Sequence, residues 1–300
     1  MNRTVRAHLS LIAITLIFGL HYSIAKGLMP GYLHPLQLLF LRSLGGLILF
    51  WIFHKLFIRE KVEKKDLLIL ALCGLTGFAL NQAFFYVGLN LTTPVDASLI
   101  HVLNPILVML FAGIIIREKI TWIKIAGIAL GGGGALVLIL YGKSVNMSTN
   151  SFAGNICIFL NMVFYALYLV LLKPMAVKYH PITILMWVSL FGFIFILPVC
   201  LKGITDIHLQ DLPAGAWLAI GYVVVFNTFL AYILINVAMK VLNASAVSYY
   251  SYLQPIIASV ASISLGNEIL TIPKVFAALL IFAGVFLVNR KKKIENLLTE

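Results

Sequence analysis

The stretch "YLHPLQLLFLRSLGG", at residues 32–46, returns in altered form as "KYHPITILMWVSLFG" at residues 178–192. In both copies His-Pro follows the first two residues, and both carry a Ser-Leu pair and a glycine at matching places. The first copy holds Arg42 in an otherwise apolar run, whereas the second holds Val188 there. The repetition predicts a duplicated helical unit, and the single arginine indicates that the two units differ in chemistry.

The composition around these stretches is that of an integral membrane protein. The 300 residues are 62% hydrophobic and 11% charged, against roughly 25% charged in soluble domains. The net charge of +12 lies in short loops between apolar runs, so membrane topology explains it and a nucleic-acid partner is not expected. Cys73, Cys157 and Cys200 have neither metal-site nor disulfide spacing, and we expect no metal, no cofactor and no enzymatic activity.

Apolar runs of about 20 residues, enough to span a bilayer, recur along the whole chain. We predict ten transmembrane helices, at 8–28, 35–54, 66–89, 94–116, 121–141, 152–173, 181–201, 213–237, 244–266 and 272–289. With this arrangement, 17 of the 22 Lys and Arg residues lie on one side, 4 lie on the other, and Arg42 lies inside a helix. Cytoplasmic loops carry the excess of basic residues, so both termini are predicted to be cytoplasmic.

The repeat extends beyond the His-Pro phrase. "LNPI" at 103–106 matches "LQPI" at 253–256, and Gly134 matches Gly284 at the same spacing of 150 residues. We therefore divide the chain into a first five-helix repeat, 1–145, and a second, 146–300. Because five is odd, the second repeat starts on the opposite side of the membrane and is inverted. Inverted repeats are typical of alternating-access transporters that bind their substrate near the midplane.

Arg42 is the clearest candidate for a functional residue inside a span. It lies about seven residues into its helix, which is roughly 10 Å deep at 1.5 Å per residue, and a charge at the bilayer centre costs about 2.5–3.5 kcal/mol. Two interpretations remain open here. The side chain either faces a substrate, or it reaches the outer headgroups or a carbonyl in a structural role.

Other polar and aromatic residues within the spans complete the predicted substrate path. Asn161, Tyr165 and Tyr168 follow i, i+4, i+7 spacing and share one helix face. His101 is either a proton carrier or a hydrogen-bonding residue between helices, and Pro105 and Pro255 are predicted hinges, because proline removes a helix hydrogen bond. The remaining predicted substrate-binding residues are Asn81, Gln82, Tyr86, Asn104, Asn227, Tyr232, Tyr249, Tyr252 and Gln254.

These motifs resemble those of a known family. A proline in the fourth helix, a glutamate after it and a glycine-rich fifth helix, all repeated in the ninth and tenth, are similar to EamA-type members of the drug/metabolite transporter superfamily. "FGLHYSIAK" at 18–26 and "LRSLGG" at 41–46 also resemble phrases of that family, although Phe18 stands where many members carry Trp. The resemblance implies a ten-helix carrier of small organic solutes, which such proteins often move outward. It also implies that the fifth and tenth helices lie outside the central cavity.

The leading prediction is a secondary transporter in the bacterial inner membrane that exports amino-acid-like or aromatic metabolites by alternating access. Its expected partners are the small-molecule substrate and membrane lipid, and it is expected to be a monomer or homodimer. A channel or uniporter, and a flippase-like carrier of a lipid-linked substrate, remain as alternatives. An intramembrane enzyme is disfavoured, because the spans contain neither an HExxH motif nor a close acidic pair.

Overall fold

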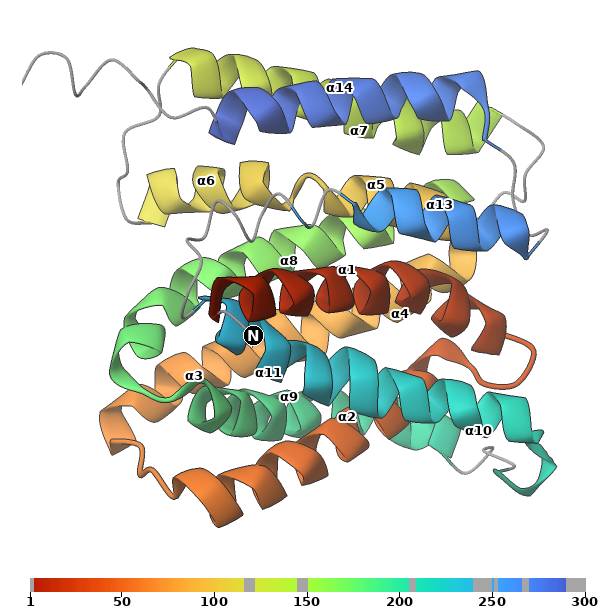
Figure 1. The fold of residues 1–300 in the computed structure, drawn as a ribbon. Helices are drawn as coiled ribbons and strands as arrows, with labels where there is room; N and C mark the ends of the chain where they lie inside the picture. The colour runs from red at the N-terminus through yellow and green to blue at the C-terminus, as the bar shows by residue number, and fades with distance from the viewer. Residues whose placement is uncertain are drawn as a thin grey trace, which may run out of the picture.

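The computed structural model describes residues 3–115, 122–144, 151–204, 209–239, 250, 253–265 and 270–289. All of the secondary structure in these residues is helical, as predicted, and the helices pack side by side (Figure 1). They are α1 (Arg3–Leu28), α2 (Pro35–Phe53), η1 (His54–Ile58), η2 (Lys64–Asp66), α3 (Leu67–Cys73), η3 (Gly74–Leu80), α4 (Asn81–Leu91), α5 (Pro94–His101), α6 (Asn104–Ile115), α7 (Trp122–Ser144), α8 (Ser151–Lys178), α9 (Pro181–Ile204), η4 (Leu209–Asp211), α10 (Ala214–Gly221), η5 (Tyr222–Leu230), α11 (Ala231–Met239), α13 (Gln254–Ser264) and α14 (Ile272–Asn289).

Helix length separates the spans into two groups. Among the described residues, seven helical stretches are long and apolar enough to cross a membrane: Val5–Leu28, Pro35–Ile58, Lys64–Leu91, Pro94–Ile115, Ser151–Lys178, Pro181–Leu201 and Ala214–Leu234. Three shorter apolar helices, Ile125–Leu138, Gln254–Ser264 and Ile272–Leu287, lie within the other predicted spans. The count of ten transmembrane helices and their inverted arrangement stay predictions.

The predicted helix 94–116 is not continuous. It divides into α5, which ends at His101, and α6, which begins at Asn104, with a turn at Val102 and Leu103. Pro105 has no N–H group to donate to the carbonyl of His101. The chain instead closes the turn with hydrogen bonds from the Leu103 N–H to the Ile100 carbonyl and from the Ile106 N–H to the Leu103 carbonyl.

Three of the long helical stretches contain π-helical segments, η1, η3 and η5, which the sequence pattern does not predict. In η3 the hydrogen bonds run from residue i+5 to residue i, as from the Asn81 N–H to the Thr76 carbonyl. η5 lies between α10 and α11 in the same way. Such segments are uncommon in proteins and are frequent at functional sites.

The His-Pro phrases begin α2 and α9. His34 caps α2 by accepting a hydrogen bond from the Leu36 N–H, while the Gln37 side chain accepts one from the His34 N–H. His180 accepts a hydrogen bond from the Ile182 N–H at 3.3 Å at the start of α9. The proline at the first helical position suits this cap, because its missing N–H is not needed there.

Close packing at glycines places α2 against η5 and α9 against η3. A Cβ atom on Gly46 would lie 2.8 Å from the Thr228 side chain, and one on Gly192 would lie 2.5 Å from the Phe78 ring. α7 packs along α14, and the two form a layer at one edge of the molecule (Figure 1). A Cβ atom on Gly284 of α14 would lie 2.4 Å from the Gly131 nitrogen of α7, so only glycine fits this crossing.

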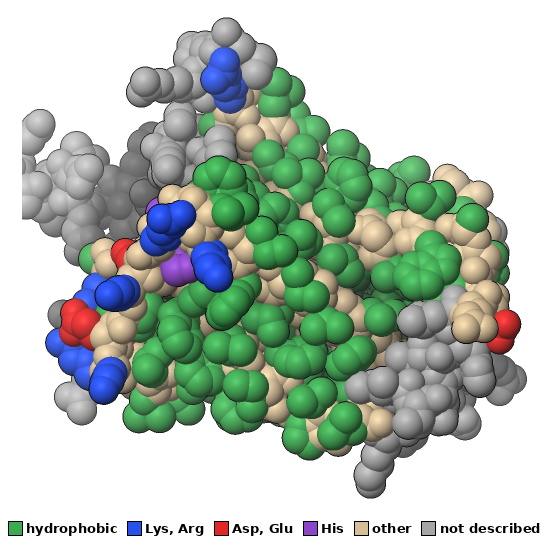
Figure 2. All heavy atoms as spheres, turned by 90° about the horizontal axis from the view of Figure 1, so that it is seen from below, with side chains coloured by type: hydrophobic (Ala, Val, Ile, Leu, Met, Phe, Trp, Pro, Cys, Tyr) green, Lys and Arg blue, Asp and Glu red, His purple; other side chains and the backbone are tan. Residues whose placement is uncertain are grey.

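The surface has the polarity of a membrane protein. Figure 2 shows hydrophobic side chains over the centre of one face, with Lys and Arg side chains gathered toward one end. The loop between α2 and α3 alone carries several exposed basic residues, Arg59, Lys61, Lys64 and Lys65. This asymmetry agrees with the predicted cytoplasmic location of that loop.

Candidate functional site

A cavity of about 250 Å³ lies between the helices, near the middle of the long apolar stretches. Residues from α1, α2, α4, α5, α6, α8, η5, α11 and α13 line it, whereas α7 and α14 contribute none of the lining among the described residues. The lining residues are Phe18, His21, Tyr22, Arg42, Asn81, Gln82, Phe85, Ser98, His101, Val102, Asn104, Pro105, Asn161, Met162, Tyr165, Asn227, Tyr232 and Gln254.

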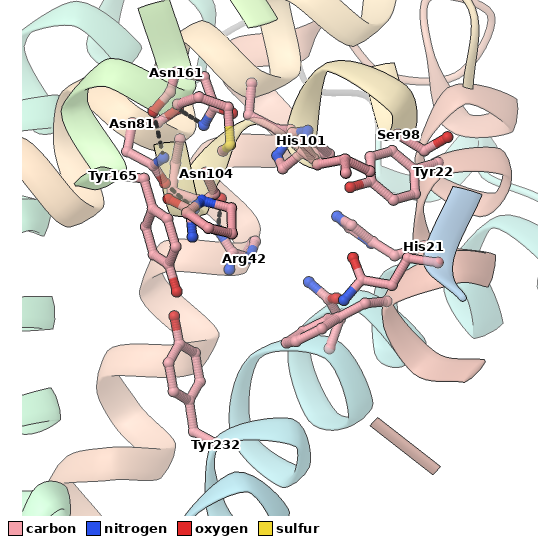
Figure 3. Close-up of a pocket in the computed structure, with 18 residues that line it drawn as sticks. His21, Tyr22, Arg42, Asn81, Ser98, His101, Asn104, Asn161, Tyr165 and Tyr232 are labelled. Carbon is pink, nitrogen blue, oxygen red and sulfur yellow. Dashed lines mark hydrogen bonds between the residues drawn. The ribbon is translucent and has the colours of Figure 1, made fainter. Parts of the chain in front are cut away.

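Among the described residues that line this cavity, Arg42 is the one with a Lys, Arg, Asp or Glu side chain. Its side chain is 4% exposed and extends from α2 into the middle of the site (Figure 3). The Nε donates to the Thr228 hydroxyl at 2.9 Å, one Nη donates to the Gln82 carbonyl oxygen, and the guanidinium carbon lies 5.9 Å from the centre of the Tyr86 ring. Within the described part of the chain no carboxylate lies in ion-pair distance of Arg42. The buried positive charge is thus held by neutral groups.

A chain of hydrogen bonds continues from Arg42 to the opposite wall. The Gln82 amide donates to the Asn81 side-chain oxygen at 2.5 Å. The Asn81 amide donates to the Asn161 main-chain carbonyl at 2.9 Å, and the Asn161 amide donates to the Asn81 main-chain carbonyl at 2.8 Å. This reciprocal pair joins α4 to α8, so the network sets the position of Arg42 relative to both helices.

Several buried polar atoms at the cavity have no hydrogen-bond partner among the described residues. They include the side-chain carbonyl oxygens of Asn104, Asn161 and Asn227. A buried polar group without a partner costs about 1–3 kcal/mol, and native proteins retain few of them. These oxygens are therefore available to accept hydrogen bonds from a molecule that enters the cavity.

Aromatic rings form another part of the wall. The His101 ring lies edge-on to Tyr22 at 5.4 Å and to Phe85 at 5.7 Å. A ring nitrogen of His101, Nδ1, lies 2.8 Å from the Ala97 carbonyl, so it is the protonated nitrogen and donates there. That bond occupies Nδ1, and in a neutral imidazole it leaves Nε2 as an acceptor. The wall combines apolar faces, suited to the carbon skeleton of a solute, with a few polar atoms.

Most of the predicted site residues meet at this cavity. The lining includes Arg42, Asn81, Gln82, His101, Asn104, Asn161, Tyr165, Asn227, Tyr232 and Gln254, together with the predicted hinge Pro105. Tyr249 and Tyr252 lie outside the described residues. Pro255 is buried in the first turn of α13 and does not line the cavity. Whether these residues bind a substrate, and whether the prolines are hinges, stay predictions.

Two predicted residues lie behind the cavity wall. Tyr86 is fully buried beneath the Arg42 guanidinium. Tyr168 lines a smaller hollow of about 10 Å³, next to the cavity, together with Phe50, Gly77, Phe78, Leu185, Val188, Thr228 and Tyr232. At 1.5 Å per residue, Tyr168 is about 10 Å farther along α8 than Asn161, so sharing a helix face with Asn161 does not bring it to the same cavity.

Sequence reasoning missed part of the lining, above all on α1. Phe18, His21, Tyr22, Phe85, Ser98, Val102 and Met162 also face the cavity. Most of these are apolar, and a pattern of apolar residues cannot distinguish a cavity wall from a lipid-facing surface. His21 is different, because a histidine in an apolar span is itself a signal of a functional position.

Ionic contacts lie away from the cavity, near the ends of the helices. Lys274, only 2% exposed, and Asp96 form a buried ion pair at 3.1 Å between α14 and α5. At the C-terminal end of α8, Lys178 pairs with Asp66 at 2.6 Å and with Glu63 at 2.7 Å. The hydrogen bonds from Lys178 and Lys65 hold the pKa of Glu63 below its ordinary value. Across the described ranges, no group of three or more His, Cys, Asp or Glu residues could hold a metal ion.

Comparisons with known proteins agree with this architecture. An uncharacterized transporter of Bacillus subtilis, YyaM, is 31% identical over 73% of this chain and 70% of its own length. A protein of Streptantibioticus cattleyicolor, named "Probable terminal-alkyne amino-acid exporter", is 24% identical over 77% of this chain and 76% of its own. A crystal structure of a protein with 17% identity shares the fold, with a TM-score of 0.60 over 95% of this chain and 98% of its own.

The family comparison identifies two matching segments. The model of the EamA-like transporter family matches residues 5–140 and again residues 152–290. The names of the family and of the relatives indicate transporters and not enzymes. Together with the seven long apolar helices, this match shows that the chain is a multi-pass membrane protein belonging to the EamA-like transporter family.

Proposed function

We propose that this protein is a secondary carrier that exports small amino-acid-like carboxylates across the bacterial plasma membrane by alternating access. The observation that carries the proposal is the buried guanidinium of Arg42, which faces the cavity without a carboxylate partner in the described residues. A buried charge is costly unless it is paired and hydrogen-bonded. A substrate carboxylate would supply the missing charge.

The hydrogen bonds of Arg42 leave room for that carboxylate. One Nη donates to Gln82 and Nε donates to Thr228, while the other Nη makes no hydrogen bond to a described residue. A carboxylate accepts strong, charge-assisted hydrogen bonds from arginine. The cavity lining contains no acidic side chain among the described residues, so a purely cationic solute would meet repulsion and no compensating charge.

The rest of the cavity supports a small zwitterionic solute. The unpartnered oxygens of Asn104, Asn161 and Asn227 can accept hydrogen bonds from an ammonium group. The volume of about 250 Å³ is smaller than the roughly 300–1,000 Å³ of pockets for drug-sized ligands, which favours a metabolite over a bulky lipid-linked molecule. The exporter name of the Streptantibioticus relative supports the same class of solute and the outward direction.

The transport mechanism that we propose uses ten transmembrane helices in two inverted five-helix repeats, residues 1–145 and 146–300. The two matches of the family model, one in each half, support a duplication. So does the packing, in which α2 of the first half contacts η5 of the second, and α9 of the second half contacts η3 of the first. Similar halves of opposite orientation can exchange conformations to open the cavity to either side.

Counterflow in proteoliposomes tests the proposal. Vesicles preloaded with an unlabelled L-amino acid are mixed with a trace of the labelled compound, and each acid is compared with its carboxamide. We expect saturable exchange of acids and at least a tenfold lower exchange of the amides, which lack the negative charge. Equal exchange of the acids and their carboxamides would contradict a role of Arg42 in charge recognition. Flux that never saturates would indicate a channel, and no exchange of any acid would overturn the proposed substrate class.

A further inference from the structure

His21 is one of the two histidines of α1, and it was not among the predicted site residues. Its side chain is 6% exposed and lines the cavity. Figure 3 shows the ring reaching into the open space from the side opposite Arg42. Nδ1 is buried and has no hydrogen-bond partner among the described residues. A polar group is thus aimed into the site and left unsatisfied by the described protein.

The orientation of His21 is set by its surroundings. Its ring stacks on Phe85, with centroids 5.5 Å apart and planes 13° apart, and meets the edge of Tyr86 at 6.1 Å. The backbone before it is also held, since the Tyr222 hydroxyl donates to the Ile17 carbonyl at 2.7 Å. A Cβ atom on Gly19 would lie 2.6 Å from Ile257, so α1 crosses α13 in close contact here. Rigid support of this kind is what a recognition residue requires.

His101 provides a contrast within the same cavity. Its Nδ1 contacts the Ala97 carbonyl at 2.8 Å, within its own helix. His21 has no such internal partner in the described chain, although a neutral imidazole offers one donor and one acceptor. Each unsatisfied buried group in a native structure requires an explanation. A bound solute that supplies hydrogen bonds at this point is the explanation that also accounts for the ring lying in the cavity.

We propose that His21 is a specificity-determining residue, which hydrogen-bonds a polar group on the side chain of the solute while Arg42 holds its carboxylate. This inference rests on the proposed function and narrows it. The solute is then an amino-acid-like molecule whose side chain carries a hydroxyl, amide or ring N–H group. The packed rings of Phe85 and Tyr22 beside His21 surround the apolar part of that side chain.

Matched pairs of labelled amino acids test the proposal in the counterflow assay. Threonine and valine have nearly the same shape, and tyrosine differs from phenylalanine by one hydroxyl. For the wild-type protein we expect the polar member of at least one pair to have a kcat/KM at least about tenfold higher, because a site built for a hydrogen bond rejects the analogue that lacks it. His21→Phe keeps a ring against Phe85 and removes both nitrogens, and we expect it to abolish this preference.

Two variants separate recognition from folding. His21→Gln retains a donor and an acceptor, and we expect it to keep part of the preference. His54→Phe makes the same exchange as His21→Phe in η1, away from the cavity, and should leave the ratio unchanged. A preference that survives His21→Phe in folded protein, or wild-type exchange without any preference, would overturn the role of His21 while leaving the proposed carrier intact. No exchange of any amino acid would overturn both proposals.

Discussion

α2 and α9 place Arg42 and Val188 at the same position of the repeated His-Pro phrase, and both side chains are buried, at 4% and 3% exposed. Their neighbours differ. Arg42 lines the 250 Å³ cavity and donates hydrogen bonds to Gln82 and Thr228. Val188 packs in an apolar cluster with Leu70, Cys73, Phe78, Tyr168, Met175, Tyr179 and Ile184, beside a hollow of about 10 Å³.

The comparison shows that burial and helix position do not determine chemistry in this fold. The turn of α2 that carries Arg42 contacts polar side chains, whereas the matching turn of α9, which carries Val188, packs in an apolar cluster. The difference lies in the helices opposite, since α4 and η5 present Gln82 and Thr228 to α2. One copy of the phrase can therefore hold a charge that the other copy cannot.

Adding a charge to the second copy of the phrase is expected to have the largest effect on stability. Val188→Arg would bury a cation in an apolar cluster, at a cost of about 3 kcal/mol or more. We expect the yield of monodisperse protein and the midpoint of thermal unfolding in detergent to fall sharply. Val188→Leu, which keeps the site apolar, should behave close to wild type. A Val188→Arg protein that remains as stable as wild type would show that the second copy also tolerates a charge.

Removing the charge from the first copy should abolish function with less effect on folding. Arg42→Val makes α2 resemble α9, and the loss of a buried charged hydrogen-bond partner costs about 2–5 kcal/mol. At the lower end of that range we expect kcat/KM for carboxylates to fall at least about 30-fold, since 1.4 kcal/mol is tenfold. Lys61→Val, an exposed loop change, is the control. If Arg42→Val gives unfolded protein instead, the arginine is structural.

The glycines that follow the two positions sharpen the comparison at a smaller scale. Gly192→Ala would place a Cβ atom 2.5–2.7 Å from three atoms of Phe78, whereas Gly46→Ala would meet chiefly one methyl group of Thr228 at 2.8 Å. Overpacking costs about 1–3 kcal/mol, so Gly192→Ala should lower the unfolding midpoint more than Gly46→Ala. Because Thr228 holds Arg42, Gly46→Ala should instead raise KM severalfold. The opposite ranking of the two midpoints would contradict this account of the packing.

The helix caps should give the smallest effects, and similar ones in both copies. His34 and His180 each accept a hydrogen bond from the N–H group two residues later, at 3.5 and 3.3 Å. Loss of a cap typically costs about 1 kcal/mol, and these long bonds place His34→Ala and His180→Ala at or below that value. Thermal unfolding of the two variants provides the measurement. A large difference between them would mean that one histidine has a role beyond capping.

Much of the fold could be predicted because long apolar runs and capping signals are local. The His-Pro starts of α2 and α9 are examples, as each follows from a few adjacent residues. The break between α5 and α6 could be predicted only as a bend, because Pro105 removes a hydrogen bond but does not specify the turn at Val102 and Leu103. The three π-helical segments η1, η3 and η5 could not be predicted from any pattern in the sequence.

The candidate site could be predicted where polar residues stand out in apolar helices. Arg42, Asn81 and Asn161 could be identified for this reason, and all three line the cavity. Tyr168 was also predicted to line the cavity but does not, because helix spacing gives the direction of a side chain and not the depth at which a cavity ends. The apolar lining residues, such as Phe85, could not be identified, since lipid and protein interior favour the same side chains in a membrane helix.

The π-helical segment η3 has a consequence for how the site can change. Asn81 directly follows it, and the i+5 hydrogen bond to Thr76 accommodates more chain per turn than an α-helix does. If Gly74–Leu80 wound as an α-helix with the same number of residues, the extra residue would turn the two ends of the span by about 100° relative to each other. Asn81 and Gln82 would then leave the cavity, although the sequence would be unchanged. The residues that face this cavity thus depend on how the helix winds as well as on which residues it contains.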